Sequence, residues 1–244
     1  SKIAPEGVNA YDEVPYKSFP FVQTHPSRLA TIGSIFGMKP AMPDRCRVLE
    51  LGCASGGNLL PMAERFPESE FIGIDLSQQA ITQGTAFANS LGLKNLSLRH
   101  ADIAAVDSSW GEFDYVIAHG VFSWVPASVQ EKIFSICRQL LKPQGIGYIS
   151  YNTYPGWRMR GMIRDVMLYR AQFFKEPAEQ LREARALVDF LAKSVPVEKN
   201  PYGILLNDEL KLLQSKEDYY LLHEFLEVVN TPLYFHEFIE RAEK

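Results

Sequence analysis

The sequence of 244 residues has few cysteines, no long apolar run and no excess of positive charge. Cys46, Cys53 and Cys137 are odd in number and lack CxxC spacing, which argues against a disulfide framework and a zinc knuckle. No stretch approaches the roughly 18 apolar residues of a membrane span, and the first ten residues lack the apolar core of a signal peptide. We therefore expect a cytoplasmic protein without a metal site and without membrane insertion.

The charge balance is slightly acidic, with 25 basic and 29 acidic residues and a net charge of −4. This balance argues against a general nucleic-acid binder, because such proteins present an excess of positive charge to the phosphates. Apolar residues make up 46% of the chain and charged residues 22%, which is typical of a globular protein. The length predicts one large domain, or one domain with an appendage.

Short apolar segments alternate with helical patterns in the first part of the chain. The predicted strands cover residues 47–51, 70–74, 96–99, 113–118 and 146–151. Ser77 is predicted to cap a helix that stops at Gly92, and residues 142–145 are predicted to form a turn before the last strand. Alternation of this kind predicts an α/β fold with a doubly wound, Rossmann-like parallel sheet covered by helices on both faces.

After Tyr151 the pattern becomes purely helical. The predicted helices cover residues 157–174, 177–193, 207–214, 217–229 and 235–243. We therefore expect three parts: an N-terminal lid segment and helix (1–44), a ligand-binding core (45–156) and a helical region (157–244). No strand is predicted after the fifth, so its edge would be open to pairing with another chain, and an oligomer could form there.

A glycine-rich turn follows the first strand in the sequence Glu50-Leu-Gly52-Cys-Ala-Ser-Gly56-Gly57-Asn58. In doubly wound folds such a turn lies at the carboxyl edge of the sheet, where ligands approach the main chain. The glycine spacing does not match the dinucleotide fingerprint, and no lysine follows as in a P-loop. Glu50 would repel a diphosphate but suits an ammonium group, which favours S-adenosylmethionine. An ordinary strand-to-helix loop is the alternative.

Two further carboxylates follow the next two strands. Asp75 ends the second strand, 75 − 52 = 23 residues beyond Gly52, where an acidic side chain accepts the ribose hydroxyls. Asp102 follows the third strand and could accept the adenine amino group, while the N–H of Ile103 meets a ring nitrogen. Each carboxylate alone could be a helix cap or a surface charge. Three at the tips of successive strands favour a single nucleoside ligand.

These motifs carry a family resemblance. Glu50-x-Gly52-x-x-x-Gly56, Asp75 and Ala101-Asp102 resemble the successive motifs of class I S-adenosylmethionine-dependent methyltransferases, over about residues 45–155. The stretches from Tyr11 to Pro26 and from Ser150 to Trp157 are similar to the group with an attached methyltransferase regulatory domain, which includes rickettsial protein-lysine methyltransferases acting on outer-membrane proteins.

The resemblance implies a cofactor, a reaction and a set of binding residues. The cofactor would be S-adenosylmethionine, and the methyl group would pass by in-line displacement to a protein side chain, with lysine favoured. The implied cofactor contacts are Glu50, Gly52, Ser55, Gly56, Asn58, Asp75, Leu76, Asp102, Ile103 and His119, with Tyr16 and Gln23 in a lid that excludes water. A simple hydrophobic latch is the alternative for the lid segment. The family usually has a sixth and a seventh strand. Because neither is predicted here, we expect residues 157–244 to begin a truncated regulatory or substrate domain.

Four residues are candidates for handling the methyl acceptor. His119 follows the fourth strand, and imidazole titrates near neutral pH, so it could remove a proton; a packed or ligand-contacting histidine is the alternative. Trp124 could wall an acceptor channel or belong to the core. Tyr151 and Asn152 follow the fifth strand and could orient the acceptor, or they could serve the turn around Pro155.

Other functions remain open from the sequence alone. A small-molecule methyltransferase and a non-catalytic cofactor-binding module would share the same motifs. Four arginines at positions 158, 160, 164 and 170 stand against a lone Asp165 in one predicted helix. They predict either a solvated helix face or a dock for an acidic partner or a nucleic-acid backbone.

Overall fold

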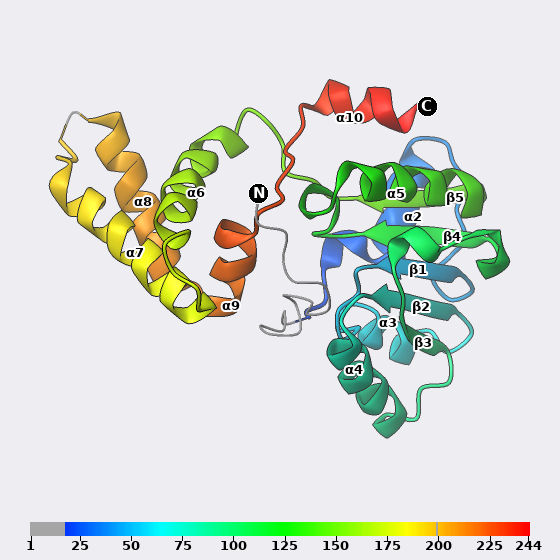
Figure 1. Ribbon diagram of the computed structural model, residues 1–244. Helices are drawn as coiled ribbons and strands as arrows, with labels where there is room; N and C mark the ends of the chain where they lie inside the picture. Colours follow the sequence, from blue (N-terminus) through cyan, green and yellow to red (C-terminus); the bar gives the residue numbers. More distant parts are fainter. Residues whose placement is uncertain (1–17, 199) are drawn as a thin grey trace. The chain divides into compact units, whose positions relative to one another are not determined.

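The computed structural model describes residues 18–198 and 200–244, so Tyr16, predicted as part of a lid, lies outside the described residues. The chain divides into two compact units, Ser1–Tyr151 and Asn152–Lys244. Figure 1 shows the sheet with its helices in the first unit, and helices in the second. Within the described ranges, no helix is both long and apolar enough to cross a membrane.

The first unit alternates strands and helices along the chain. Its strands are β1 (Arg47–Leu51), β2 (Glu70–Asp75), β3 (Leu96–His100), β4 (Phe113–Ala118) and β5 (Leu141–Ile149). Its α-helices are α2 (Pro26–Ile35), α3 (Leu60–Arg65), α4 (Gln78–Ser90) and α5 (Ala127–Leu140). Its 3-10 turns are η1 (Val22–Thr24), η2 (Ile103–Ala105), η3 (Ser108–Trp110) and η4 (Phe122–Trp124).

All strand pairs in the sheet are parallel, and the strand order is β3-β2-β1-β4-β5. The chain moves outward from β1 to β3 and then returns to the other side of β1 with β4. This reversal creates a topological switch point between β1 and β4, where α/β sheets bind ligands. The predicted fold class is thereby confirmed.

Side chains alternate between the two faces of the buried strands. Val48, Phe71, Tyr115 and Ile117 pack in one cluster with residues of α2 and α3, so these two helices cover one face. Figure 1 shows α4 beside β2 and β3, and α5 beside β4 and β5. The central strands β1 and β4 are almost wholly buried, which explains why most of their residues are apolar.

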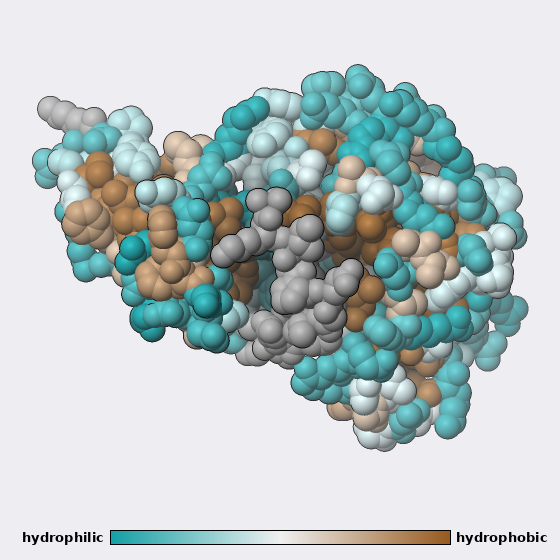
Figure 2. All heavy atoms as spheres, in the orientation of Figure 1, coloured by the Kyte–Doolittle hydropathy of each residue, from teal (hydrophilic) through white to brown (hydrophobic). Residues whose placement is uncertain are grey.

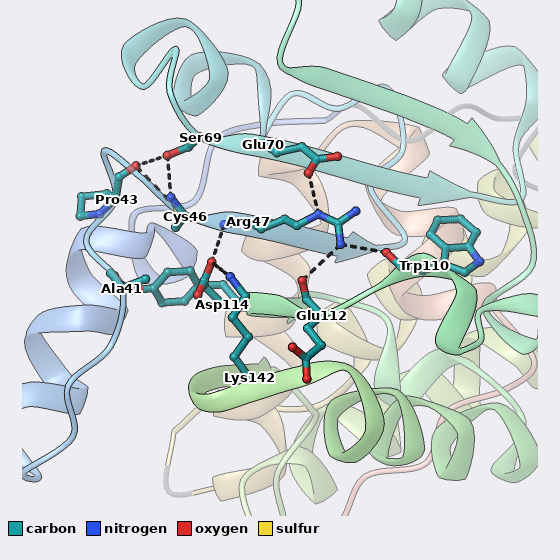
Figure 3. Close-up of polar contacts among 11 residues, drawn as sticks. Ala41, Pro43, Cys46, Arg47, Ser69, Glu70, Trp110, Glu112, Asp114 and Lys142 are labelled. Carbon is teal, nitrogen blue, oxygen red and sulfur yellow. Dashed lines mark hydrogen bonds and ion pairs between the residues drawn. The ribbon is translucent and has the colours of Figure 1, made fainter.

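The amino ends of the strands lie together at one side of the sheet, which we call its amino edge. A network of paired polar groups holds them there (Figure 3). The Arg47 guanidinium donates to Glu70 at 2.6 Å and to the Trp110 carbonyl at 2.8 Å. Asp114 accepts from the backbone N–H of Arg47 at 2.7 Å and pairs with Lys142 at 2.9 Å. These contacts tie β1, β2, β4 and β5 together at one end.

The last strand differs from its prediction. It begins at Leu141 and includes residues 142–145, which the sequence predicts as a turn, and it ends at Ile149 rather than at residue 151. Leu141 pairs with Phe113, and the register shifts between Phe113 and Tyr115. Four residues, 142–145, separate Leu141 from Ile146, whereas only Asp114 separates their partners Phe113 and Tyr115, so this stretch is an irregularity within the strand. Pro143 is tolerated there because β5 has only one neighbour in the sheet.

The second unit is helical. It contains α6 (Trp157–Ala171), α7 (Pro177–Ser194), α8 (Pro201–Ser215), α9 (Asp218–Leu221), the π-helical turn η5 (Leu222–Leu226) and α10 (Phe235–Ala242). Its core joins Ile163 and Met167 of α6 with Val188 of α7 and Phe225 of η5. Two predicted helices have the wrong bounds. The helix predicted over 207–214 is α8, which already begins at Pro201, and the helical segment predicted over 217–229 ends with η5 at Leu226.

The arginine row of α6 is not an open basic surface. Arg164 is buried, and Arg160 lies 3.7 Å from Glu209 and 3.8 Å from Glu224. Arg170 pairs with Glu183 at 2.6 Å, so acidic groups of the same unit compensate much of the positive charge. Figure 2 shows that the surface over α7 and α8 instead mixes hydrophobic with hydrophilic side chains.

Candidate functional site

The glycine loop joins β1 to α3 in an unusual backbone conformation. Gly52, Ala54 and Gly56 all have positive φ, at 74°, 47° and 75°. The loop also lies directly on the elements beside it, since a Cβ added at Gly84 of α4 would come within 2.2 Å of the Ser55 carbonyl oxygen. The glycines therefore serve a left-handed turn and close packing at once.

The N–H groups of this loop are used inside the protein. Gly52 and Cys53 both donate to the Ile74 carbonyl at 2.9 Å, and Gly56 donates to the Cys53 carbonyl at 2.8 Å. Ala54 donates to Asp75 and Gly57 to Ser18, each at 2.8 Å. These five N–H groups are therefore bonded within the protein, and the predicted approach of a ligand to the main chain of this loop stays a prediction. The loop is thus no phosphate nest, which agrees with a ligand lacking phosphate.

Glu50 lies near the carboxyl end of β1 and is only 3% exposed. Its Oε1 accepts a hydrogen bond from Asn58 Nδ2 at 2.7 Å, whereas its buried Oε2 has no partner within the described residues. Burial raises the pKa of Glu50 to about 7, with the Asn58 bond lowering it and the charge of Asp75 raising it. A buried carboxylate oxygen without a partner is costly, and a cationic ligand group would satisfy it.

The N-terminal segment lies against this carboxylate. Asn58 Oδ1 accepts from the backbone N–H of Phe21 at 2.9 Å and from the Thr24 hydroxyl at 3.1 Å. The Phe21 ring lies 4.2 Å from the His119 ring, centroid to centroid. His119 follows β4, its Nδ1 is buried without a partner among the described residues, and burial lowers its pKa. Glu50 and His119 thus flank the switch point from two neighbouring strands.

Asp75 and Asp102 follow the ends of β2 and β3, as predicted. Asp75 accepts backbone N–H groups from Ala54 on one oxygen and from Ser77 on the other, both at 2.8 Å. Asp102 is exposed and accepts from the Ala104 N–H at 2.8 Å, which makes it the cap of η2. Both carboxylates therefore have structural partners in addition to any ligand.

The remaining predicted contacts lie at different depths. Leu76 is 51% exposed, Gln23 is exposed in η1, and Ser55 is half-buried in the loop, whereas Ile103 is buried. Trp124 lies at the end of η4, and Tyr151 packs edge-on to Phe122 at 6.3 Å between ring centroids. Asn152 belongs to the second unit, where it donates to Asn230 at 3.2 Å.

Sequence reasoning missed Ser18 and Thr24. Ser18 Oγ accepts from the Gly57 N–H at 2.8 Å, and Thr24 is completely buried. The chain separation between these residues and their partners is 34 to 39 positions, so no local pattern predicts the contacts. The one available signal was the concentration of aromatic residues around them.

Taken together, the switch point, the glycine loop and the carboxylates at three strand ends define a Rossmann-like, cofactor-binding α/β protein. The family described as "Methyltransferase domain" matches residues 48–145. The uncharacterized protein RP028 of Rickettsia prowazekii is 42% identical over 96% of this chain and 94% of its own length. The chain belongs to the class I S-adenosylmethionine-dependent methyltransferase family, and the predicted family and cofactor are confirmed.

Two longer proteins are also similar to the chain. The uncharacterized protein RP789 of the same organism is 44% identical over 97% of this chain. The structure of PKMT2 from Rickettsia typhi in complex with AdoHcy has 41% identity and a TM-score of 0.85 over 94% of this chain. The chain spans 43% of RP789 and 44% of that PKMT2 chain, less than half of either.

Proposed function

We propose that this protein transfers a methyl group from S-adenosylmethionine to a protein side chain, with lysine favoured. The observation that carries the cofactor assignment is the buried Oε2 of Glu50, which has no partner among the described residues. When bound, the cofactor supplies a methyl group on a sulfonium centre. Glu50 would hold its ammonium group, and Asp75 and Asp102 would hold the ribose and the adenine.

The acceptor side rests on other residues. The pKa of His119 is lowered by burial, so its imidazole is largely neutral at pH 7 and able to take a proton from an acceptor amine. The Phe21 ring packs against it, with 4.2 Å between ring centroids, and would limit the access of water to that side of the imidazole. Support for lysine comes from the likeness to PKMT2, together with the sequence resemblance to rickettsial protein-lysine methyltransferases. Tyr151, Asn152 and Trp124 stay candidates for orienting the acceptor.

Activity is tested with the 244-residue protein, methyl-labelled S-adenosylmethionine and a bacterial lysate. We expect label in protein, and we expect acetylation of the lysate's lysines to remove it. Label that persists after acetylation would overturn lysine as the acceptor. Label in the small-molecule fraction would favour a small-molecule methyltransferase, and cofactor binding without any transfer would favour a non-catalytic module.

Cofactor binding itself is best tested at Glu50. Asp75→Ala is a poor choice because it also removes the partners of the Ala54 and Ser77 N–H groups. Glu50→Gln keeps an oxygen for Asn58, removes the charge and places an amide NH2 group where the second carboxylate oxygen was. The affinity for S-adenosylmethionine is measured by calorimetric titration of the unsubstituted protein and of Glu50→Gln. Equal affinities would show that Glu50 does not bind the ammonium group.

A further inference from the structure

The side-chain amide of Asn58 is the contact shared by strand β1 and the N-terminal segment. Its Nδ2 donates to Glu50 at 2.7 Å, and its Oδ1 accepts from the Phe21 N–H and the Thr24 hydroxyl. Asn58 is 2% exposed and Thr24 is fully buried, so water does not compete for these bonds. The amide therefore cannot turn without breaking contacts on both sides.

The segment of residues 18–25, which we call the cover segment, has two further attachments near the same place. Ser18 Oγ accepts from the Gly57 N–H at 2.8 Å and lies 3.4 Å from the Cys53 carbonyl oxygen. The Phe21 ring contacts His119 after β4. The cover segment thus touches the glycine loop, the residue that binds Glu50 and the end of the neighbouring strand.

Hydrogen bonds in a chain strengthen one another. A donor bonded to a carboxylate polarises the rest of its amide, and this makes the amide oxygen a better acceptor. A cation at Oε2 favours the ionised form of Glu50. Ionised Glu50 polarises Asn58 more strongly than protonated Glu50 does, so the bonds from Asn58 to Phe21 and Thr24 gain strength when the cation is present.

We propose that Asn58 is a positioning residue that couples ligand binding at Glu50 to docking of the cover segment. The inference rests on the proposed function, because the cation is the ammonium group of the cofactor. Asn58 itself does not contact the cofactor in this role, unlike the direct contact that the family resemblance implies. Its two ends hold Glu50 in place and hold residues 18–25 over the loop.

The coupling is measured by a double-mutant cycle with S-adenosylmethionine as the probe. Thr24→Val removes a hydroxyl that is shared between Asn58 Oδ1 at 3.1 Å and the Phe21 carbonyl at 2.9 Å. We expect it to weaken binding about threefold to fivefold through faster dissociation. The Phe21 contact is lost in both backgrounds of the cycle, so the cycle isolates the contact with Asn58. In an Asn58→Ala background the same substitution should change the affinity by less than about 1.5-fold. An equal loss in both backgrounds would overturn the coupling.

A matched control lies nearby in the same unit. Thr31 is exposed on α2, and among the described residues its hydroxyl bonds to the Ser27 carbonyl alone, at 2.8 Å. Thr31→Val should leave the affinity unchanged. Asn58→Asp is the second variant, because it keeps an acceptor for the cover segment and replaces the donor to Glu50. It should weaken binding while Thr24→Val still has its effect.

The pH dependence separates positioning from a merely structural role. The titratable neighbours of Glu50 are Asp75 and Cys53, and both remain in the variants. Loss of the Asn58 bond raises the pKa of Glu50, so the pH midpoint for binding should move up by about one unit in Asn58→Ala. Titration of the cofactor is common to both proteins. A uniform loss at every pH would contradict the proposal.

Failure of cofactor binding and failure of the coupling through Asn58 give different results. If the unsubstituted protein does not bind S-adenosylmethionine, the proposed function fails and this inference fails with it. If it binds, and Asn58→Ala shifts neither the affinity nor the pH midpoint, only the role of Asn58 is overturned. Thermal unfolding shows whether each variant is folded. If Asn58→Ala does not fold, the coupling is tested with Asn58→Asp and Thr24→Val instead.

Discussion

The amino ends and the carboxyl ends of the parallel strands, which form the amino edge and the carboxyl edge of the sheet, are built in opposite ways. At the amino edge, Arg47, Glu70, Asp114 and Lys142 pair with one another or with backbone groups. At the carboxyl edge, Glu50 and His119 each bury a polar atom that has no partner among the described residues. The first arrangement holds the fold together, whereas the second costs stability and leaves capacity for a ligand.

The comparison predicts that substitutions at the two edges have opposite effects on stability and binding. Carboxyl-edge changes should remove function while sparing or improving the fold. Amino-edge changes should weaken the fold without touching the ligand. A substitution that breaks this division would show that the two edges are not functionally separate.

The largest effect is expected for Glu50→Gln. It removes the charge that faces the ammonium group, so the affinity for S-adenosylmethionine at pH 8 should fall about 30- to 100-fold. The pKa of Glu50 is raised from 4.5 to about 7 in the folded protein, so the folded state binds the proton more tightly. The free energy of unfolding therefore decreases as pH rises from about 4.5 to 7, by about 3 kcal/mol in total.

Removal of that ionisation cost should make Glu50→Gln more stable than the unsubstituted protein by about 2 kcal/mol at pH 8, because a newly buried amide N–H offsets about 1 kcal/mol. The gain should vanish near pH 4.5. Denaturant unfolding at several pH values measures it, with Glu70→Gln at the amino edge as a control. A loss of stability in Glu50→Gln at pH 8 would contradict the prediction.

A smaller effect of the opposite kind is expected for Asp114→Ala. The variant leaves the Arg47 N–H and the Lys142 ammonium without their acceptor, and Lys142 is partly exposed, so the loss should be about 2 kcal/mol. Cofactor affinity, measured below the melting temperature, should stay within about twofold. A large drop in the cofactor affinity of fully folded Asp114→Ala would show that the amino edge influences the carboxyl edge.

The smallest effect is expected for His119→Phe. Burial lowers the pKa of His119, so the unfolded chain binds the proton more tightly, and the folded protein loses stability as pH falls below 6.5. This contribution is at most about 1.4 kcal/mol per pH unit. The variant keeps an aromatic ring against Phe21 and Tyr148 and should lose this part of the pH dependence. Unfolding curves at pH 5.5 and 7.5 compare the two proteins, and an unaltered pH dependence would count against the assignment.

Local patterns in the sequence predict much of the fold. The first four strands lie within one residue of their predicted bounds, Ser77 caps α4, and Gly92 follows its end with φ of 71°. The failures are those that local patterns cannot avoid. Residues 142–145 read as a turn but form an irregular stretch inside β5, between Leu141 and Ile146, which pair with β4. Arg160 and Arg170 of α6 find acidic partners on α8 and α7.

The candidate site divides in the same way. The order of apolar segments, glycines and carboxylates along the chain determines which residues stand at the carboxyl ends of the strands, because strand and helix periods are local properties. Only the tertiary structure decides that Glu50 is buried, that the loop N–H groups are already bonded, and that Asn58 joins β1 to Thr24. Burial and contacts across more than 30 residues arise from packing of the whole unit, which no short stretch of sequence contains.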